Sequence, residues 1–182
     1  MKPKFTNRPN EELKLPDGRT VWLSRSPAVV VVVLARCKED IFVLTEKRSP
    51  TMIDAPNLWA VPSGYLDWDE TGWQAVVREL FEETSFYIPK YEDRLITNNN
   101  REPWFVNTHP KENNQNVAMT YCLVYNFDKG LPDIEKYKDS EIAEIKWMRI
   151  SHIFYPEYKW AFKHDERIAT AAGKFRNYLI QD

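Results

Sequence analysis

Three glutamates on one predicted helix are the residues of this sequence best suited to metal chemistry. Glu79, Glu82 and Glu83 lie at positions i, i+3 and i+4 of an amphipathic stretch. At about 100° per residue they occupy an arc of roughly 100°, away from the apolar stripe. Such close like charges oppose one another by roughly a few tenths of a kcal/mol per pair in an isolated helix, so helix formation alone does not favour the cluster. A bound divalent cation would favour the cluster, because Mg²⁺ prefers carboxylate oxygens and keeps positions open for water and phosphates.

The spacing of these glutamates from upstream residues is a second observation. Glutamates on the outer face of a helix are also typical of a solvated surface, so the helix alone leaves both interpretations open. Five residues separate Gly64 from Glu70, and seven more precede the segment Arg78-Glu79-Leu80-Phe81-Glu82-Glu83-Thr84-Ser85-Phe86. This arrangement resembles the Nudix box, G-x5-E-x7-R-E-U-x-E-E-x-G-U, where U is a bulky aliphatic or similar apolar residue. Six literal positions match, which chance would produce on the order of once in ten million placements at a usage of roughly 5–7% per residue type.

Two serines depart from the Nudix pattern. Ser85 stands where the family has glycine, just after the helix, where a left-handed residue is usual. Serine there costs about 1 kcal/mol of backbone strain relative to glycine. We expect an altered helix exit with activity retained, because this position touches no ligand. Ser63 stands where many relatives have glycine, and the family uses the main-chain carbonyl of that residue for metal, which serine can still supply.

The resemblance implies both metal ligands and a reaction. Glu79, Glu82 and Glu83 would bind Mg²⁺, with Mn²⁺ as the alternative ion, next to the carbonyl of Ser63. A cation bridging the phosphates neutralises charge and orients a water for in-line displacement at phosphorus. The implied activity is hydrolysis of the phosphoanhydride bond in a nucleoside diphosphate linked to another moiety, such as ADP-ribose or a related dinucleotide.

The other box residues receive supporting roles from the same resemblance. Arg78 is expected to orient a glutamate through a bidentate pair, with a plain surface salt bridge as the alternative. Glu70 precedes Thr71, the expected helix cap, so it could act on the helix N-terminus alone; in the family it is often structural or a peripheral ligand. Gly64 is expected to line the substrate site and to permit a close approach that only glycine tolerates.

A carboxylate from outside the box is expected to act as general base or additional metal ligand, because related enzymes often bring a glutamate over the metal from the region after the long strand. Glu141 has this position, just before a predicted strand. A base there could take the proton from the attacking water. Glu112, Glu144 or another residue of the Lys111–Asn116 loop are the alternatives, since Glu141 also fits a plain acidic loop.

Substrate contacts are expected from two further residues. Arg48 follows a predicted strand and could meet a substrate phosphate, with solvent exposure as the alternative. Trp59 could stack on a base, as could Trp104 and Phe105, although large aromatic residues are more often part of the core. His109 and His164 have no metal-ligand spacing, and we interpret both as non-catalytic.

The Nudix family spans nucleoside triphosphates, dinucleotides, nucleotide sugars and capped RNA, and the box does not separate them. The stretch Ala161-Phe162-Lys163-His164 resembles an Ala-Phe-Asp-His stretch of ADP-ribose-type relatives. The alternatives are a nucleoside triphosphate pyrophosphohydrolase and a non-catalytic nucleotide-sensing regulator, which would have a degraded box. The Nudix-fold isopentenyl diphosphate isomerase needs a cysteine before the box, and the segment from Trp59 to Ser63 has none.

The elements that position these residues can be predicted from periodicity and capping. Thr71 and Gln74 form a capping box that starts a helix over Thr71–Thr84. The almost pure valine run Ala28–Ala35 is typical of a strand buried on both faces, and it is expected to form a hairpin with Ile41–Lys47. Further strands are expected at Thr20–Leu23, Trp59–Val61, Arg94–Thr97, Trp104–Asn107, Val117–Phe127 and Ile142–Arg149, and helices at residues 157–163 and 165–180. The fold class expected from the resemblance is α/β, a Nudix-type α/β/α sandwich with a mixed β-sheet.

Composition is consistent with one globular enzyme domain. The 182 residues are expected to form a single Nudix domain, with residues 1–20 as an N-terminal extension. A net charge of −2 and the absence of a long apolar run argue against nucleic acid and membrane partners. Cys37 and Cys122 sit in apolar surroundings and are interpreted as free thiols of a reducing compartment, so a cytoplasmic location is expected. The expected partner is a small nucleotide substrate, and a homodimer is left open.

Overall fold

The computed structural model describes residues 10–97, 101–110, 116–135 and 141–180. Its helices are α1 (Gly72–Thr84), α2 (His164–Lys174) and α3 (Arg176–Leu179), with 3₁₀ helices at Ile88–Arg94 and Ile150–His152. Its strands are β1 (Glu11–Lys14), β2 (Thr20–Leu23), β3 (Ser26–Cys37), β4 (Asp40–Arg48), β5 (Trp59–Ala60), β6 (Ser63–Tyr65), β7 (Phe105–Asn107), β8 (Asn116–Asn126) and β9 (Ile142–Arg149).

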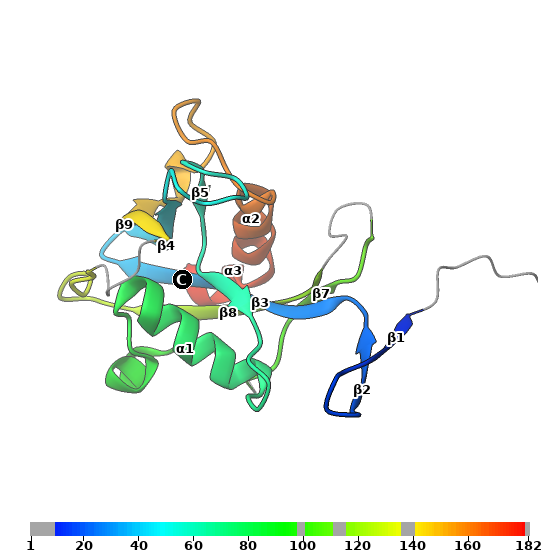
Figure 1. Cartoon of the computed structure of the whole chain (residues 1–182). Helices are drawn as coiled ribbons and strands as arrows, with labels where there is room; N and C mark the ends of the chain where they lie inside the picture. Colours follow the sequence, from blue (N-terminus) through cyan, green and yellow to red (C-terminus); the bar gives the residue numbers. More distant parts are fainter. Residues whose placement is uncertain (1–9, 98–100, 111–115, 136–140, 181–182) are drawn as a thin grey trace, which may run out of the picture.

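A seven-stranded mixed sheet organises the described residues (Figure 1). The strands follow the order β5-β4-β3-β8-β7, while β6 pairs with β3 and β9 pairs with β4. β3 and β8 run parallel, and the other pairs of this sheet are antiparallel. The hairpin predicted from the valine run and the following strand is therefore confirmed as β3–β4.

The valine run of β3 is buried because the sheet carries a core on each face. Val29, Val31 and Val33 pack on one side, together with Val76 and Leu80 of α1. The alternate residues Val30, Val32 and Leu34 pack on the other side, where α2 supplies Ile168 and Ala171. Successive side chains of a strand point to opposite faces, so a strand between two helical layers must be apolar throughout. The predicted α/β/α sandwich with a mixed sheet is confirmed.

α1 begins as its sequence predicts, whereas its exit keeps the usual left-handed cap instead of the altered exit expected for serine. Thr71 accepts a hydrogen bond from the main-chain N–H of Gln74, whose side chain accepts one from the N–H of Thr71, so the capping box is present. Ser85 ends the helix in the left-handed conformation with φ 56°. The apolar side of α1 buries Ala75, Val76 and Leu80 completely, whereas Phe81 is exposed.

Two predicted elements are wrong, and two strands and the two 3₁₀ helices were not predicted. Residues 157–163 form turns and a bridge between Trp59 and Trp160, because this segment hydrogen-bonds along β5 and cannot also coil into a helix. Residues 94–97 follow a 3₁₀ helix, and of a strand there only the bridge from Leu95 to Tyr125 is present. β6 was not predicted, and neither was β1, which forms a separate two-stranded sheet with β2 inside the region interpreted as an extension.

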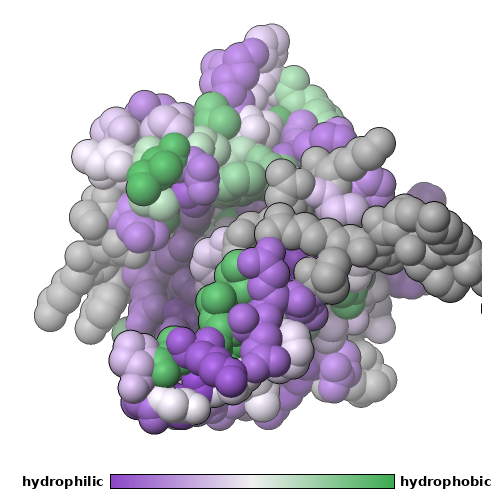
Figure 2. Space-filling model, turned by 45° about the vertical axis from the view of Figure 1, so that its right-hand side comes forward, coloured by the Kyte–Doolittle hydropathy of each residue, from purple (hydrophilic) through white to green (hydrophobic). Residues whose placement is uncertain are grey.

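The surface is mainly polar. Figure 2 shows a face on which hydrophilic side chains predominate and hydrophobic ones form small patches. Within the described ranges, no helix is long and apolar enough to cross a membrane. Cys37 and Cys122 are both buried free thiols, as predicted.

Candidate active site

The turn between β5 and β6 brings main-chain atoms against the acidic side of α1. The Pro62 carbonyl accepts a hydrogen bond of 2.8 Å from the Val31 N–H, and Ser63 pairs with Val30 of the central strand. This pairing fixes the turn to the middle of the sheet. The Ser63 N–H then donates to Oε2 of Glu83 over 3.0 Å. The predicted neighbours Ser63 and Glu83 are therefore brought together by the fold.

Gly64 lies in contact with Glu79. A Cβ built on Gly64 would overlap the Glu79 carboxylate, with Oε1 as the nearest atom. Glycine is required here because there is no room for a side chain, since even the methyl group of alanine would displace the Glu79 carboxylate of the proposed site. The close approach predicted for Gly64 is confirmed, while its contact with substrate stays a prediction.

The box glutamates differ in exposure. Glu79 and Glu83 are 8% and 6% exposed, whereas about half of the Glu82 side chain is exposed. Burial raises the pKa of Glu83 well above its usual range, and the neighbouring Glu46 and Glu79 carboxylates raise it further, while the Ser63 N–H opposes them. Burial also raises the pKa of Glu79, against the lowering effect of Arg78. The negative forms of Glu79 and Glu83 are thus disfavoured in the absence of a cation.

Glu46 of β4 is a fourth carboxylate of this cluster, and it was not predicted. It is fully buried and close enough to Glu83 to raise the pKa of that residue. Glu46 lies inside the predicted strand Ile41–Lys47, and its neighbour Glu83 is distant along the chain, so residue spacing does not indicate their contact. The available signal was a glutamate following Leu44 and Thr45 in a strand that had to be buried.

Arg78 joins the glutamates of the box into a network. Its Nε and Nη2 donate to the two carboxylate oxygens of Glu70 over 3.1 and 2.6 Å. Its Nη1 donates to Glu79 over 2.8 Å and to Glu82 over 3.1 Å. The bidentate partner is therefore Glu70, whose pKa the guanidinium lowers. Glu70 also accepts from the Asp67 N–H over 2.8 Å, so it connects the loop before α1 to the helix.

The donor set fits a hard divalent cation. Buried carboxylates supply the hard oxygen ligands that Mg²⁺ prefers, and the carbonyl of Ser63 stays a predicted ligand. Nevertheless, no three acidic, histidine or cysteine side chains converge as a ready ion cage in the part of the chain described. Arg78 holds Glu79 and Glu82 by hydrogen bonds.

Glu141 lies beside the residue that follows the end of β4. The Glu141 carbonyl accepts a hydrogen bond of 2.6 Å from the Ser49 N–H, and Glu141 is exposed. It lines a surface pocket together with Arg48, Met52 and Asp54. Glu144 lies on β9 opposite Lys47, with a half-exposed side chain. Glu112 and most of the Lys111–Asn116 loop lie outside the described residues, so the identity of the general base stays a prediction.

The two predicted substrate contacts have different surroundings. Arg48 Nε donates to the Asp54 carbonyl over 3.1 Å, and its guanidinium lies 5.2 Å from the centre of the Phe162 ring. Trp59 is only 5% exposed and packs edge-on against Tyr158, so its ring has little surface for a ligand. A substrate-binding role for Trp59 stays a prediction.

Comparison with known proteins identifies the family of this chain. The family model described as the NUDIX domain matches residues 24–170. The chain belongs to the Nudix family. The match includes the central sheet, α1 with its glutamates, and the first part of α2.

A curated relative and several solved structures show how far the similarity extends. The m7GpppN-mRNA hydrolase NUDT17 of Bos taurus is 37% identical over 75 residues, which are 41% of this chain and 22% of that protein. The matched stretch thus covers only about a fifth of the relative. The NUDIX domain of Shewanella oneidensis NrtR, complexed with ADP ribose, is 18% identical over 84% of this chain and 89% of that one, with a TM-score of 0.60.

A bifunctional NMN adenylyltransferase/ADP ribose pyrophosphatase from Francisella tularensis, complexed with AMP and a manganese ion, is also similar. It is 24% identical over 83% of this chain and 42% of that one, with a TM-score of 0.64. At these identities the solved structures show a shared fold.

Proposed function

We propose that this Nudix chain is a Mg²⁺-dependent hydrolase of a nucleoside diphosphate linked to another moiety, such as ADP-ribose or a related dinucleotide. The observation that carries the proposal is that Glu83 accepts a hydrogen bond from the Ser63 N–H and Glu79 lies against Gly64, on the same helix that carries Glu82. Two of these carboxylates are buried although burial raises their pKa. A bound cation would relieve the unfavourable charge of these two carboxylates.

The proposed roles follow from the contacts. Glu79, Glu82 and Glu83 would hold the cation with the Ser63 carbonyl, and Arg78 would position Glu79 and Glu82. When bound, the cation supplies charge neutralisation at the phosphates and favours ionisation of the attacking water. That water forms a bond to phosphorus, the bridging P–O bond breaks, and the products are two phosphate monoesters when the substrate is ADP-ribose. Arg48, at the end of β4, is available to neutralise the phosphates at the rim.

Two similarities support a nucleotide diphosphate as substrate. The Shewanella domain is complexed with ADP ribose, and the Francisella protein is named an ADP ribose pyrophosphatase. The curated relative is named an m7GpppN-mRNA hydrolase, which also cleaves a nucleotide-linked anhydride. A capped dinucleotide therefore belongs in any substrate test beside ADP-ribose.

The decisive experiment is a substrate panel with Mg²⁺ and, separately, Mn²⁺. ADP-ribose, a dinucleoside polyphosphate, the cap dinucleotide m7GpppG and a nucleoside triphosphate would each be incubated with the protein and the products separated by chromatography. We expect AMP and ribose 5-phosphate from ADP-ribose. Release of pyrophosphate from the triphosphate alone would instead indicate the alternative, a triphosphate pyrophosphohydrolase. Binding without turnover of any compound would indicate a nucleotide-sensing protein.

We also propose Glu141 as the general base or an additional ligand, from its position at the rim beside Arg48. Its test is Glu141→Gln beside Glu144→Gln, with the exposed Glu157→Gln as the control away from this rim. Loss of kcat in Glu141→Gln alone, with kcat kept in Glu144→Gln and Glu157→Gln, is the expected result. Near-wild-type kcat with unchanged metal dependence would reassign the base to the box glutamates or to Glu144.

A further inference from the structure

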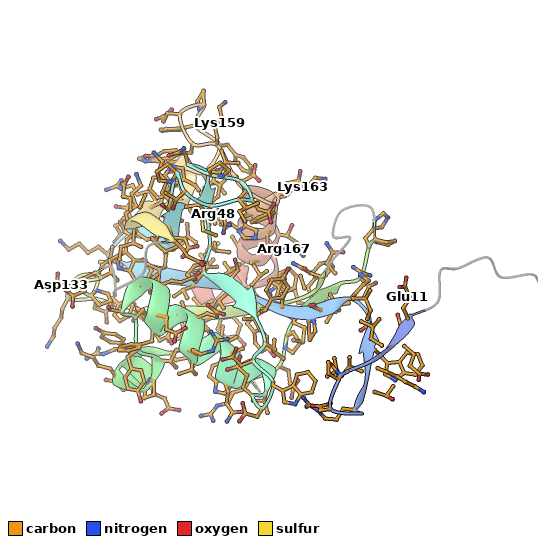
Figure 3. The ribbon with its side chains drawn as sticks, in the orientation of Figure 1. Glu11, Arg48, Asp133, Lys159, Lys163 and Arg167 are labelled. Atoms are coloured by element: carbon orange, nitrogen blue, oxygen red, sulfur yellow. The ribbon has the colours of Figure 1, made fainter. Side chains whose placement is uncertain are left out.

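The β1–β2 hairpin stands apart from the seven-stranded sheet. β1 and β2 pair with each other in a sheet of their own. Figure 1 shows this hairpin to the right of the large sheet, beyond the start of β3, and Figure 3 marks Glu11 on it, at the opposite end of the view from Asp133. A two-stranded hairpin by itself is at best marginally stable in water. A contact outside this small sheet would therefore stabilise it.

The hairpin exposes large apolar side chains. Leu13 of β1 is 44% exposed, and Trp22 and Leu23 of β2 are 62% and 50% exposed. Leu13 lies opposite Val21, and residues two positions apart in a strand share a face, so Leu13, Val21 and Leu23 lie on the same face of the hairpin. The hairpin thus presents apolar surface beside the outer edge of β1.

The main-chain groups of Glu12 and Lys14 point to this outer edge. The Leu15 N–H donates to the Arg19 carbonyl over 2.8 Å, so the main chain of Leu15 faces β2. This direction alternates along an antiparallel strand, so Leu13 also faces β2, whereas Glu12 and Lys14 face the other side. Within the described ranges, β2 is the only strand that pairs with β1. Such an edge is a template for pairing with a further strand.

The charges of this edge select one symmetric register. When two copies of β1 pair antiparallel about a two-fold axis, residues that point to the edge pair with each other. Glu12 opposite Glu12, or Lys14 opposite Lys14, would place like charges face to face, which is destabilising. Glu12 opposite Lys14 places opposite charges on both sides of the axis and brings Leu13 against Leu13 between them. Charged residues usually protect an edge strand from pairing, but these charges favour pairing in this single register.

From this edge we infer that β1 pairs antiparallel with β1 of a second copy of the chain. Glu12 of each copy lies opposite Lys14 of the other, and the two Leu13 side chains meet at the two-fold axis. The result is a continuous sheet in the order β2-β1-β1-β2, held by main-chain hydrogen bonds at each Glu12–Lys14 pair. The same edge serves both copies, so the contact closes on a dimer. This inference concerns assembly and does not depend on the reaction at the glutamates of α1.

The test measures molar mass by sedimentation velocity over a range of protein concentrations. We expect wild type to pass reversibly from the 21.6 kDa of one chain to twice that mass as its concentration rises. Glu12→Lys and Lys14→Glu each place like charges opposite one another, so each should raise the dimer dissociation constant about tenfold or more. Both substitutions in one chain restore opposite charges, so the double variant should regain the wild-type affinity.

A mixture of the two single variants tests the pairing directly. Equimolar Glu12→Lys and Lys14→Glu bring the lysines of one copy opposite the glutamates of the other. The mixture should therefore dimerise more strongly than either variant alone. Circular dichroism of each variant, at a concentration where wild type is a monomer, should match wild type and show that the fold is intact.

Glu39→Lys and Lys129→Glu are the matched controls, because they make the same charge changes at exposed residues outside the hairpin. Each should dimerise as wild type does, and their mixture should gain nothing. Several results would overturn the inference: wild type that stays monomeric at every concentration, a dimer that neither single substitution weakens, a double variant that stays weak, or a mixture that gains no more than the control mixture.

Discussion

Glu83 is a proposed metal ligand whose negative charge is disfavoured by burial and by neighbouring carboxylates. Its raised pKa means that the negative form is destabilised by burial and by Glu46 in the cation-free protein. Glu83→Gln keeps the shape and removes the charge. We predict that kcat falls by orders of magnitude, and the same for Glu82→Gln. At neutral pH and without metal, Glu83→Gln should at the same time unfold at equal or higher urea concentration than wild type. Full activity of both variants at saturating Mg²⁺ would contradict the ligand assignment.

His164 gives a prediction on pH. Its pKa is lowered to about 3 by burial and by two arginines, whereas an unfolded histidine titrates near 6.5. The neutral imidazole therefore contributes stability that is complete above pH 6.5 and is lost as the pH falls toward 3. Between pH 7 and pH 5 this loss is about 2 kcal/mol in the free energy of unfolding.

The matched variant is His164→Asn, which keeps a side-chain acceptor for the Val61 N–H but does not titrate. Urea titrations from pH 7 to pH 5 should give a steeper fall in the unfolding free energy for wild type than for His164→Asn. Parallel curves would show that His164 is protonated in the folded state at these pH values.

At the scale of elements, α1 and β6 approach each other through Gly64. We predict that Gly64→Ala lowers kcat strongly and costs about 1–3 kcal/mol of stability, as an overpacked contact does. The new Cβ would displace the Glu79 carboxylate. The control is Gly173→Ala in α2, where a Cβ meets nothing within 4 Å. Because alanine favours a helix over glycine, Gly173→Ala should stabilise the protein by roughly 0.5–1 kcal/mol and leave kcat unchanged. Equal effects of both substitutions on kcat would argue against the Gly64 contact.

At the scale of the whole molecule, the cation should stabilise the fold as well as support catalysis. A ligand that binds only the folded state raises the unfolding free energy by an amount set by its concentration and affinity. We predict that Mg²⁺ raises the thermal midpoint of wild type, that excess EDTA abolishes hydrolysis, and that the midpoint shift shrinks in Glu83→Gln. Differential scanning calorimetry with and without Mg²⁺ measures the shift. Hydrolysis that continues in excess EDTA would refute the mechanism.

The local parts of this protein could be predicted from the sequence because their signals are local. The capping pair Thr71 and Gln74 marks the start of α1, and Ser85 takes the left-handed conformation that is usual after a helix. The unbroken apolar run of valines predicts a strand buried on both faces, which β3 is. The spacing from Gly64 to Glu83 predicts the family, because few other requirements place six such residue types at these intervals.

Only the tertiary structure decided which distant residues meet. Glu46 joins the box glutamates because β4 pairs with β3, the strand on which α1 packs, and nothing near Glu46 along the chain indicates that contact. A helix over residues 157–163 would be too short to be stable by itself. The segment instead forms hydrogen bonds with Trp59 of β5, so tertiary packing overrides its local preference. The same packing turns Phe162 outward beside Arg48. Residue type and spacing determine the chemistry available to a chain, whereas burial and proximity arise only when separated segments fold against one another.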